Sequence, residues 1–246
     1  MRYATLCVIA SALALAALPA RTSGSAIYWA DYDAGVIQRA GLDGSGVQEV
    51  LKCFPQGIAL DLDARRMYWT DIPPLGSPLP GRIERANLDG SEREVLVQML
   101  PNPVGIALQP AGGNIAAPKL LWTDTSTNDI HRADLDGSRH EIVLGNLSSP
   151  FGIAVDAVAG KMYWTRAATY LDPRPPSPAV QRANLDGTNL ESLVVGLPGP
   201  TSGIALDPAA GQMYWGYFDP TINTIQAGSI RRCNLDGSWT GRVWRS

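Results

Sequence analysis

One sequence unit recurs five times in this chain of 246 residues. Every copy contains a residue pair that ends in Trp and, further along, a Leu-Asp-Gly turn. The turns begin at regular intervals of 46 to 50 residues, at Leu42, Leu88, Leu135, Leu185 and Leu235. A fixed period of this kind is typical of propellers and solenoids, in which one supersecondary unit is copied and stacked.

Within one unit, the residue pattern predicts four short β-strands. In the second copy, Gly57–Asp61 is a short apolar run and Met67–Asp71 is rich in aromatic and β-branched residues. The third segment, Arg82–Leu88, alternates polar and apolar residues, and Glu94–Val97 closes the unit after an Asp-Gly turn. Four such strands without helical periodicity predict one antiparallel sheet, the blade of a β-propeller. We therefore predict an all-β fold with blade units near residues 26–51, 55–97, 103–144, 150–195 and 201–244.

The second unit also carries the signature of a known family. Its residues Tyr68-Trp69-Thr70-Asp71, followed by Ile83–Ser91, resemble the low-density lipoprotein receptor class B repeat, also called the YWTD repeat. The resemblance covers residues 26–246. It implies a propeller related to the six-bladed YWTD and TolB-like propellers, one that binds proteins outside the cell. The Thr-Asp half of the motif is lost in three units, at Ala30-Asp31, Thr165-Arg166 and Gly216-Tyr217.

The number of blades is left open by the sequence. Five units are recognisable, and the first lacks a clear inner strand. Either the ring closes with five blades, or the chain is a relative of the six-bladed form that lacks one blade. An open arc would expose two sheet faces, which is an aggregation liability. For this reason we favour a closed or nearly closed ring.

Residues 1–20 are predicted to be a secretory signal peptide, followed by the propeller at 26–246. Arg2 supplies the positive start, Ala4–Leu18 is apolar, and Leu18-Pro19-Ala20 offers a cleavage site. The apolar run is too short to span a bilayer comfortably. The alternative is a degraded first strand near Ala17–Arg21. The signal interpretation predicts a secreted protein, extracellular, periplasmic or on the cell surface, with no membrane span after signal removal.

Charge and cysteine content narrow the possible partners. The net charge is −3, and no basic run is present, which argues against nucleic acid and anionic membranes as partners. After signal removal only Cys53 and Cys233 remain, and we expect two free, buried thiols rather than a disulfide framework.

Residues that recur in every unit are expected to be scaffold. A buried Trp covers a large apolar area, so we assign the repeated tryptophans to the core: Trp29, Trp69, Trp122, Trp164 and Trp215. An Arg precedes each turn, and these arginines are expected to tie strands or blades together: Arg39, Arg85, Arg132, Arg182 and Arg232. Their expected partners are Asp31, Asp71 and Asp124.

Function is expected where the units differ. In a four-stranded antiparallel blade, the link between strands two and three shares one face of the disc with the link to the next blade. Three of these links are long, at Ile72–Gly81, Ala167–Ala179 and Tyr217–Ser229, and they are rich in proline, which stiffens loops and lowers the entropy cost of binding. Aromatic and Arg side chains dominate binding energy at interfaces. The candidate partner-binding residues on this face are Phe54, Pro74, Phe151, Tyr170, Arg174, Tyr217 and Phe218.

An enzyme is the alternative. The sequence has no Gly-rich phosphate loop, no Cys/His metal spacing and no nucleophile elbow, and we expect no cofactor. His131 and His140 fall at positions expected to be exposed. Asp61, Asp156 and Asp207 occupy equivalent ends of three inner strands, and they are the residues of an alternative metal-assisted hydrolase or lyase at the axis. We favour a secreted, non-enzymatic propeller that binds an extracellular protein or polymer through one loop-rich face.

Overall fold

A computed structural model describes residues 14–16, 26–74, 76–111, 117–167, 178–197, 199–218, 228–238 and 240–245. These residues form five antiparallel sheets of four strands each, and they contain no helix. The predicted all-β fold and its five blade units are therefore confirmed. None of the described residues form a helix that could cross a membrane.

The strands follow one another through the five blades in chain order. The first sheet contains β1 (Ala14–Ala16), β2 (Ala26–Asp31), β3 (Val36–Gly41) and β4 (Gln48–Lys52). The second contains β5 (Pro55–Asp61), β6 (Arg66–Asp71), β7 (Gly81–Asn87) and β8 (Glu94–Leu100). The third contains β9 (Pro103–Gln109), β10 (Lys119–Asp124), β11 (Asp129–Asp134) and β12 (Glu141–Leu144). The fourth contains β13 (Pro150–Asp156), β14 (Lys161–Arg166), β15 (Ala179–Asn184) and β16 (Glu191–Val194). The fifth contains β17 (Thr201–Asp207), β18 (Gln212–Phe218), β19 (Gly228–Asn234) and β20 (Thr240–Arg245).

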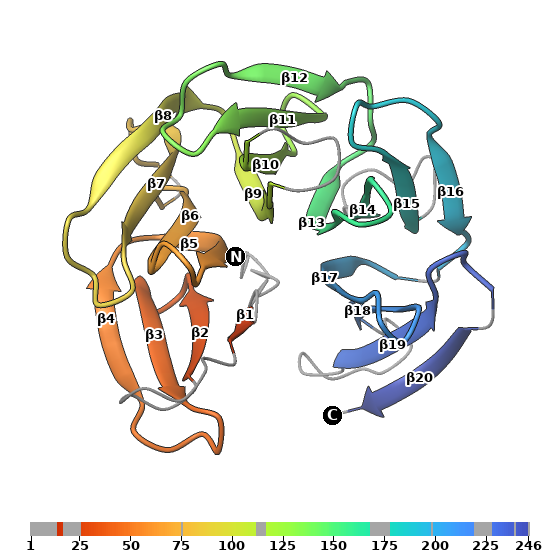
Figure 1. Cartoon of the computed structure of the whole chain (residues 1–246), viewed down its shortest axis with the longest axis horizontal. Helices are drawn as coiled ribbons and strands as arrows, with labels where there is room; N and C mark the ends of the chain where they lie inside the picture. Colours follow the sequence, from red (N-terminus) through yellow and green to blue (C-terminus); the bar gives the residue numbers. More distant parts are fainter. Residues whose placement is uncertain are drawn as a thin grey trace, which may run out of the picture.

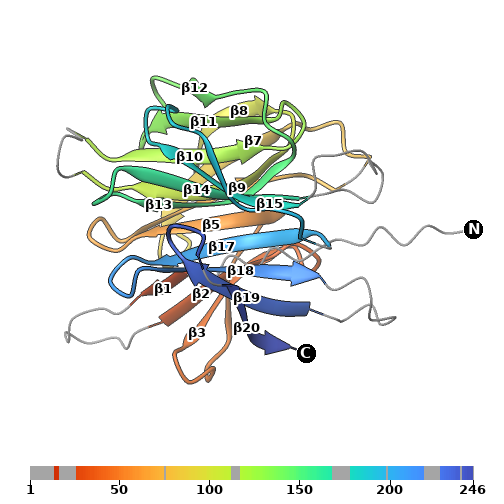
Figure 2. The same cartoon turned by 90° about the vertical axis from the view of Figure 1, so that its right-hand side faces the viewer.

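The blades are arranged around a common axis as in a propeller. Figure 1 shows the five sheets in sequence along an arc, with β5, β9, β13 and β17 innermost and the fourth strand of each blade at the rim. In the view turned by 90°, the strands run across the thickness of the disc, and the connections lie on its two opposite sides (Figure 2). The links between successive strands therefore lie on two opposite faces of the disc, as the strand order predicts.

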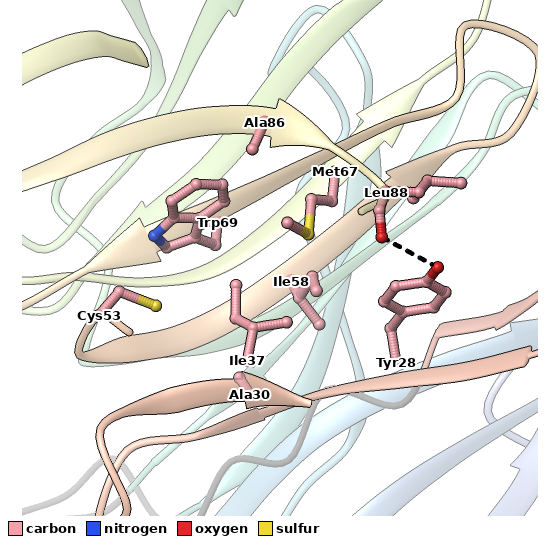
Figure 3. Packing of buried hydrophobic residues seen from close by; sticks show 9 residues of the cluster. All are labelled: Tyr28, Ala30, Ile37, Cys53, Ile58, Met67, Trp69, Ala86 and Leu88. Carbon is pink, nitrogen blue, oxygen red and sulfur yellow. Dashed lines mark hydrogen bonds between the residues drawn. The ribbon is translucent and has the colours of Figure 1, made fainter. Parts of the chain in front are cut away.

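The core lies between neighbouring sheets. Met67 and Trp69 of the second blade pack against Tyr28 and Ile37 of the first (Figure 3). The Tyr28 hydroxyl also donates a hydrogen bond of 3.1 Å to the carbonyl oxygen of Leu88 across this interface. Three equivalent clusters join the second blade to the third, the third to the fourth and the fourth to the fifth. Apolar burial between blades is thus the main source of cohesion.

Four of the five repeated tryptophans are fully buried, as predicted: Trp69, Trp122, Trp164 and Trp215. Trp29 is only half-buried. Each buried Trp points toward the blade that precedes it, and the described residues place no blade before the first. The prediction that all five tryptophans are core is therefore wrong for Trp29.

The repeated arginines tie consecutive blades together. In three blades the Arg Nη1 donates to the carbonyl oxygen of the turn Leu in the next blade, at 2.9, 3.0 and 2.9 Å. These pairs are Arg85 with Leu135, Arg132 with Leu185, and Arg182 with Leu235. The same side chains pair with Glu94, Glu141 and Glu191 of their own blades.

The expectation that aspartates pair with these repeated arginines is wrong. Asp31 instead accepts the backbone N–H of Ala34 at 2.9 Å, and Asp124 accepts backbone N–H groups of its own link. Asp71 pairs with a different arginine, Arg82. These carboxylates end the second strand of the first three blades, on the face of the disc opposite the turn that follows the repeated Arg.

The expectation of a closed or nearly closed ring is not met among the described residues. Each hydrophobic cluster found among the described residues joins consecutive sheets, and none joins the fifth sheet to the first. Figure 1 shows these two sheets facing each other across an open sector.

The first blade does have an inner strand. Ala14–Ala16 pairs antiparallel with β2, with Ala14 opposite Tyr28 and Ala16 opposite Ala26. This strand lies within the predicted signal peptide and a few residues before the alternative strand at 17–21, which falls outside the described residues. Signal cleavage after residue 20 remains a prediction.

The two thiols behave as expected. Cys53 and Cys233 are free and buried. Burial raises the pKa of Cys233 to about 12 and raises that of Cys53 further above its ordinary value. Both thiols are therefore unreactive packing residues in the folded chain.

Candidate interaction face

The links between strands two and three, together with the links between blades, form what we call the loop face. Its described segments include residues 32–35, 53–54, 72–74, 76–80, 101–102 and 125–128. Backbone hydrogen bonds hold the two kinds of link together, such as Ile72 N–H to Phe54 O at 3.0 Å and Thr125 N–H to Asn102 O at 3.1 Å. The predicted sharing of one face by these links is thus confirmed.

The Thr of the repeated motif connects neighbouring blades beneath this face. Thr70 accepts a hydrogen bond from the N–H of Gly57 in its own blade at 2.9 Å. Its hydroxyl donates to the carbonyl oxygen of Val104 in the next blade at 2.7 Å. Thr123 and Thr165 make the same pair of bonds in their blades. One hydroxyl therefore satisfies two buried backbone groups and fixes the spacing of adjacent inner strands.

The Asp of the same motif positions the link that enters its own blade. Asp71 is fully buried, and its Oδ1 accepts the backbone N–H of Phe54 at 2.6 Å. Its Oδ2 accepts Arg82 Nε at 2.9 Å and Nη2 at 2.6 Å. Arg82 Nε also lies 2.5 Å from Oε1 of the buried Glu84. The carboxylate thus ties the 53–54 link to the start of β7.

Glu84 and Arg93 extend this network toward the rim. Arg93 Nε donates to Glu84 Oε2, Nη2 donates to Oε1 at 3.1 Å, and Nη1 reaches Lys52 O at 2.8 Å. Hydrogen bonding to Glu84 raises the pKa of Arg93, although burial works in the opposite direction. The guanidinium also lies over the Trp69 ring, 5.6 Å from its centroid. A charged network of this kind makes the link before β5 rigid.

Above this support, the loop face presents exposed apolar side chains. Phe54 is 37% exposed and meets Tyr32 edge-to-face with ring centroids 6.2 Å apart. Leu79 in the proline-rich link is 60% exposed, and Met99 at the end of β8 is 74% exposed. Exposed aromatic and Met side chains are enriched at protein interfaces, so Phe54 and Met99 fit a protein-binding surface.

The predicted site residues are only partly brought together. Phe54 and Pro74 are exposed on the loop face, and Phe151 is half-buried at the start of β13. Tyr170 and Arg174 lie outside the described residues. For Phe218, the structure describes the backbone within β18 but not the side chain.

The prediction that Tyr217 is an exposed partner-binding residue is wrong. The sequence suggested an exposed aromatic anchor in a loop, but Tyr217 lies inside β18 and is only 3% exposed. Its ring packs in the cluster between the fourth and fifth blades, and the Arg231 guanidinium lies over it, 4.4 Å from the centroid. The strand continues further than expected because Tyr217 pairs with Ser229 and Phe218 pairs with Gly228.

The axial carboxylates do not form a common site. Asp61, Asp156 and Asp207 each accept the N–H of the residue three positions later, at 2.9, 2.9 and 3.0 Å. Each therefore closes its own hairpin turn. Within the described part of the chain, no group of three or more His, Cys, Asp or Glu side chains is arranged to hold a metal ion.

His131 and His140 were expected to be exposed, and this is wrong for His131. Its ring is buried and stacks on Trp122 at 5.4 Å with an interplanar angle of 8°, while its Nδ1 lies 3.0 Å from Nε2 of His140. The pair takes the place of Glu84 and Arg93 of the second blade. Burial lowers the pKa of both histidines, and the neighbouring His140 lowers that of His131 further.

Sequence reasoning missed these polar pairs, although the sequence carries a signal for them. The residue opposite each repeated Trp is polar in every blade: Gln38, Glu84, His131, Gln181 and Arg231. A polar residue that faces the repeated Trp in every blade is a candidate for a buried partner rather than for solvent.

Comparisons with known proteins agree with this architecture. A model of the "Low-density lipoprotein receptor repeat class B" family matches residues 119–157. The "Low-density lipoprotein receptor-related protein 5-like protein" of Homo sapiens is 33% identical over 208 residues, which cover 83% of this chain and 58% of that protein. "Low-density lipoprotein receptor-related protein 5" of Mus musculus is 37% identical over 124 residues, covering 48% of this chain and 7% of that protein. The chain thus spans less than two thirds of either relative.

A solved structure is similar to this chain in three dimensions. A chain in the crystal structure of a nidogen/laminin complex is similar with a TM-score of 0.67 and 25% sequence identity. The alignment covers 85% of this chain and 74% of that chain. The repeat sequence is therefore similar to this family, and the arrangement of the sheets is similar to that solved structure.

Proposed function

We propose that this chain, a member of the low-density lipoprotein receptor class B repeat family, is a secreted, non-enzymatic β-propeller. It binds an extracellular protein or polymer through its loop face. The observation that carries the proposal is the exposure of Phe54, Leu79 and Met99 on one side of the disc. The network of Asp71 and Arg82 holds the link that carries Phe54, which lowers the cost of ordering this link on binding.

The similar proteins support a binding role. The relatives are named as receptor-related proteins, and the similar solved structure contains a nidogen/laminin complex. We carry over from them only the class of activity, recognition of another macromolecule, and not the identity of the ligand.

The arrangement of the carboxylates favours binding over catalysis. Asp61, Asp156 and Asp207 each accept a hydrogen bond within their own turn instead of meeting as one catalytic group. The opposite face of the disc carries the same Asp-Gly turn in every blade. The loop face differs from blade to blade, as specific recognition requires.

A capture experiment tests the proposal. The full chain would be immobilised and exposed to proteins secreted by the source organism, beside a face variant that combines Phe54→Ala, Leu79→Ala and Met99→Ala. The matched control combines Val95→Ala, Ile142→Ala and Val158→Ala, which remove exposed apolar side chains away from the loop face.

We expect the face variant to lose at least about tenfold in recovered partner, since a few interface residues carry most of the binding energy. The control variant should recover as much partner as the unaltered chain, and the melting temperatures of the two variants should be similar. Equal recovery by the face variant and the control would contradict the proposed function.

A further inference from the structure

The link between β12 and β13 contains the only N-glycosylation sequon in the sequence. Asn146-Leu147-Ser148 is followed by Ser149 and by Pro150, the first residue of β13. An Asn-x-Ser triplet without Pro in the middle is an acceptor sequence for an N-linked glycan. Because such a glycan is bulky and hydrophilic, a folded chain accommodates it only where the Asn side chain reaches solvent. The conformation of this link therefore decides whether Asn146 is a usable site.

The link is anchored immediately after Asn146. Leu147 is 8% exposed and packs in the cluster between the third and fourth blades. Its N–H donates to the carbonyl oxygen of Asn128 at 2.9 Å, and the N–H of Ser149 donates to Oδ1 of Asn128 at 2.8 Å. Asn146 itself is exposed, and within the described ranges no hydrogen bond engages its side-chain amide. The backbone is thus fixed while the amide nitrogen of Asn146 reaches solvent.

The backbone conformation at this position suits an asparagine. Asn146 has a φ of +59°, in the left-handed region. Among residues with a side chain, Asn is one of the few that adopt this region readily. The acceptor residue therefore fits the turn that exposes it.

The other links between blades repeat this arrangement. In each link an exposed residue comes directly before a buried one, which faces the core between blades. The buried residues are Cys53, Leu100, Leu147 and Leu197, and the exposed residues, which we call the outer link positions, are Lys52, Met99, Asn146 and Gly196. Three of the four outer link positions have a positive φ, 64° at Met99, 59° at Asn146 and 68° at Gly196. The repeat itself therefore turns Asn146 toward solvent.

This equivalence places Asn146 relative to the proposed partner-binding residues. Met99, which is 74% exposed, occupies the outer link position one blade earlier. Phe54 lies in the link before that, and Leu79 lies in the second blade. Because the blades follow one another along the arc, Asn146 lies on the loop face beyond Met99 in the direction of the fourth blade (Figure 1).

We propose that Asn146 carries an N-linked glycan, and that this glycan excludes a protein partner from the 145–149 link. The partner is thereby confined to the part of the loop face that carries Phe54, Leu79 and Met99. This inference rests on the proposed function in one respect, since the chain must enter the secretory pathway to be glycosylated.

The transfer needs no rearrangement of the folded link. The Asn146 Nδ2 atom attacks C1 of the first sugar of an oligosaccharide that is linked to a lipid diphosphate. The bond between C1 and the diphosphate oxygen breaks, the bond between Nδ2 and C1 forms, the lipid diphosphate leaves, and a base of the transferase takes the amide proton. Ser148 supplies the hydroxyl that the acceptor sequence requires.

Mass spectrometry tests the site directly. The full chain is expressed in cultured eukaryotic cells, once as it stands and once with a signal peptide of proven function placed before Met1. A peptide N-glycosidase converts a glycosylated Asn to Asp, which peptide mapping detects at position 146.

We expect this conversion in most molecules recovered from the medium. Unmodified Asn146 in the form with the added signal peptide would overturn the proposal. A glycan on that form alone would support the site and contradict the secretion of the natural chain, so failure of the proposed function is distinguishable from failure of the site.

Three variants identify the acceptor. Asn146→Gly introduces the residue that Gly196 supplies at the equivalent position, so the fold and the melting temperature should be retained while the glycan is lost. Ser148→Ala should also abolish the glycan, and Ser148→Thr, which keeps the hydroxyl, should retain it. A glycan that persists in Asn146→Gly would overturn the assignment.

Oxidative footprinting of the glycosylated chain, before and after enzymatic removal of the glycan, tests its position on the loop face. We expect equal oxidation of Met99 and Phe54 in the two samples, because the glycan projects from a different link. As the positive control, Met99→Asn with Pro101→Ser transfers the sequon to the preceding link, and its glycan should reduce oxidation of Phe54. Strong shielding of Met99 by the glycan of the unaltered chain would overturn the proposed division of the face.

Discussion

The hydroxyl of Thr70 offers the sharpest test of how the blades are held together. Thr70→Val keeps the shape of the side chain and removes only the hydroxyl. The Gly57 N–H, 2.9 Å away, and the Val104 carbonyl, 2.7 Å away, would then be buried without a partner. Each unsatisfied buried group costs about 1–3 kcal/mol, so for two groups we expect a loss of about 2–6 kcal/mol in the free energy of unfolding.

Urea denaturation followed by tryptophan fluorescence measures this loss, and differential scanning calorimetry should show a melting temperature lower by about 5–15 °C. Thr70→Ser is the matched control. It retains the hydroxyl and removes one methyl group, which costs about 0.8 kcal/mol. A Val variant as stable as the unaltered chain, or a Ser variant less stable than the Val variant, would refute the role of the hydroxyl.

Two further predictions concern stability. Because burial holds the pKa values of His131 and His140 below the ordinary 6.5, the unfolded chain binds protons more readily and stability should fall as the pH drops below about 6.5. Melting curves between pH 7.5 and 5 should show this fall, and the double variant His131→Gln with His140→Leu should flatten it; an unchanged slope would refute the assignment. Trp69→Ala should cost about 3–5 kcal/mol, as truncation of a large core residue does. Trp29→Ala should cost clearly less in the same urea titration, and equal costs would contradict the open sector.

The repeat made most of the fold predictable from the sequence. Strand order, the Asp-Gly turns and the burial of Trp69 follow from local patterns that each blade copies. The burial of Trp29 was mispredicted because it depends on whether another sheet precedes the first blade, which no local pattern reports. The open arc was missed for the same reason.

The candidate site was predictable in position but not in detail. The alternation of turns correctly places Phe54 and the 72–80 link on one face. It misplaces Tyr217, since the length of β18 depends on pairing with β19 across a long connection. Alternation along β7 also does not predict that Glu84 is buried. The side chain is buried because Arg93, nine residues later, neutralises its charge, and such pairs are not visible in a single strand.

The proposal that the loop face binds the partner is tested most directly by oxidative footprinting of the full chain, alone and in complex with its captured partner. Met99 is 74% exposed on the loop face, and Val158 is 99% exposed on the opposite face. We predict that the partner strongly reduces oxidation of Met99 and Phe54 and leaves labelling of Val158 unchanged. Protection of Val158 with undiminished oxidation of Met99 would contradict the assignment of the binding face.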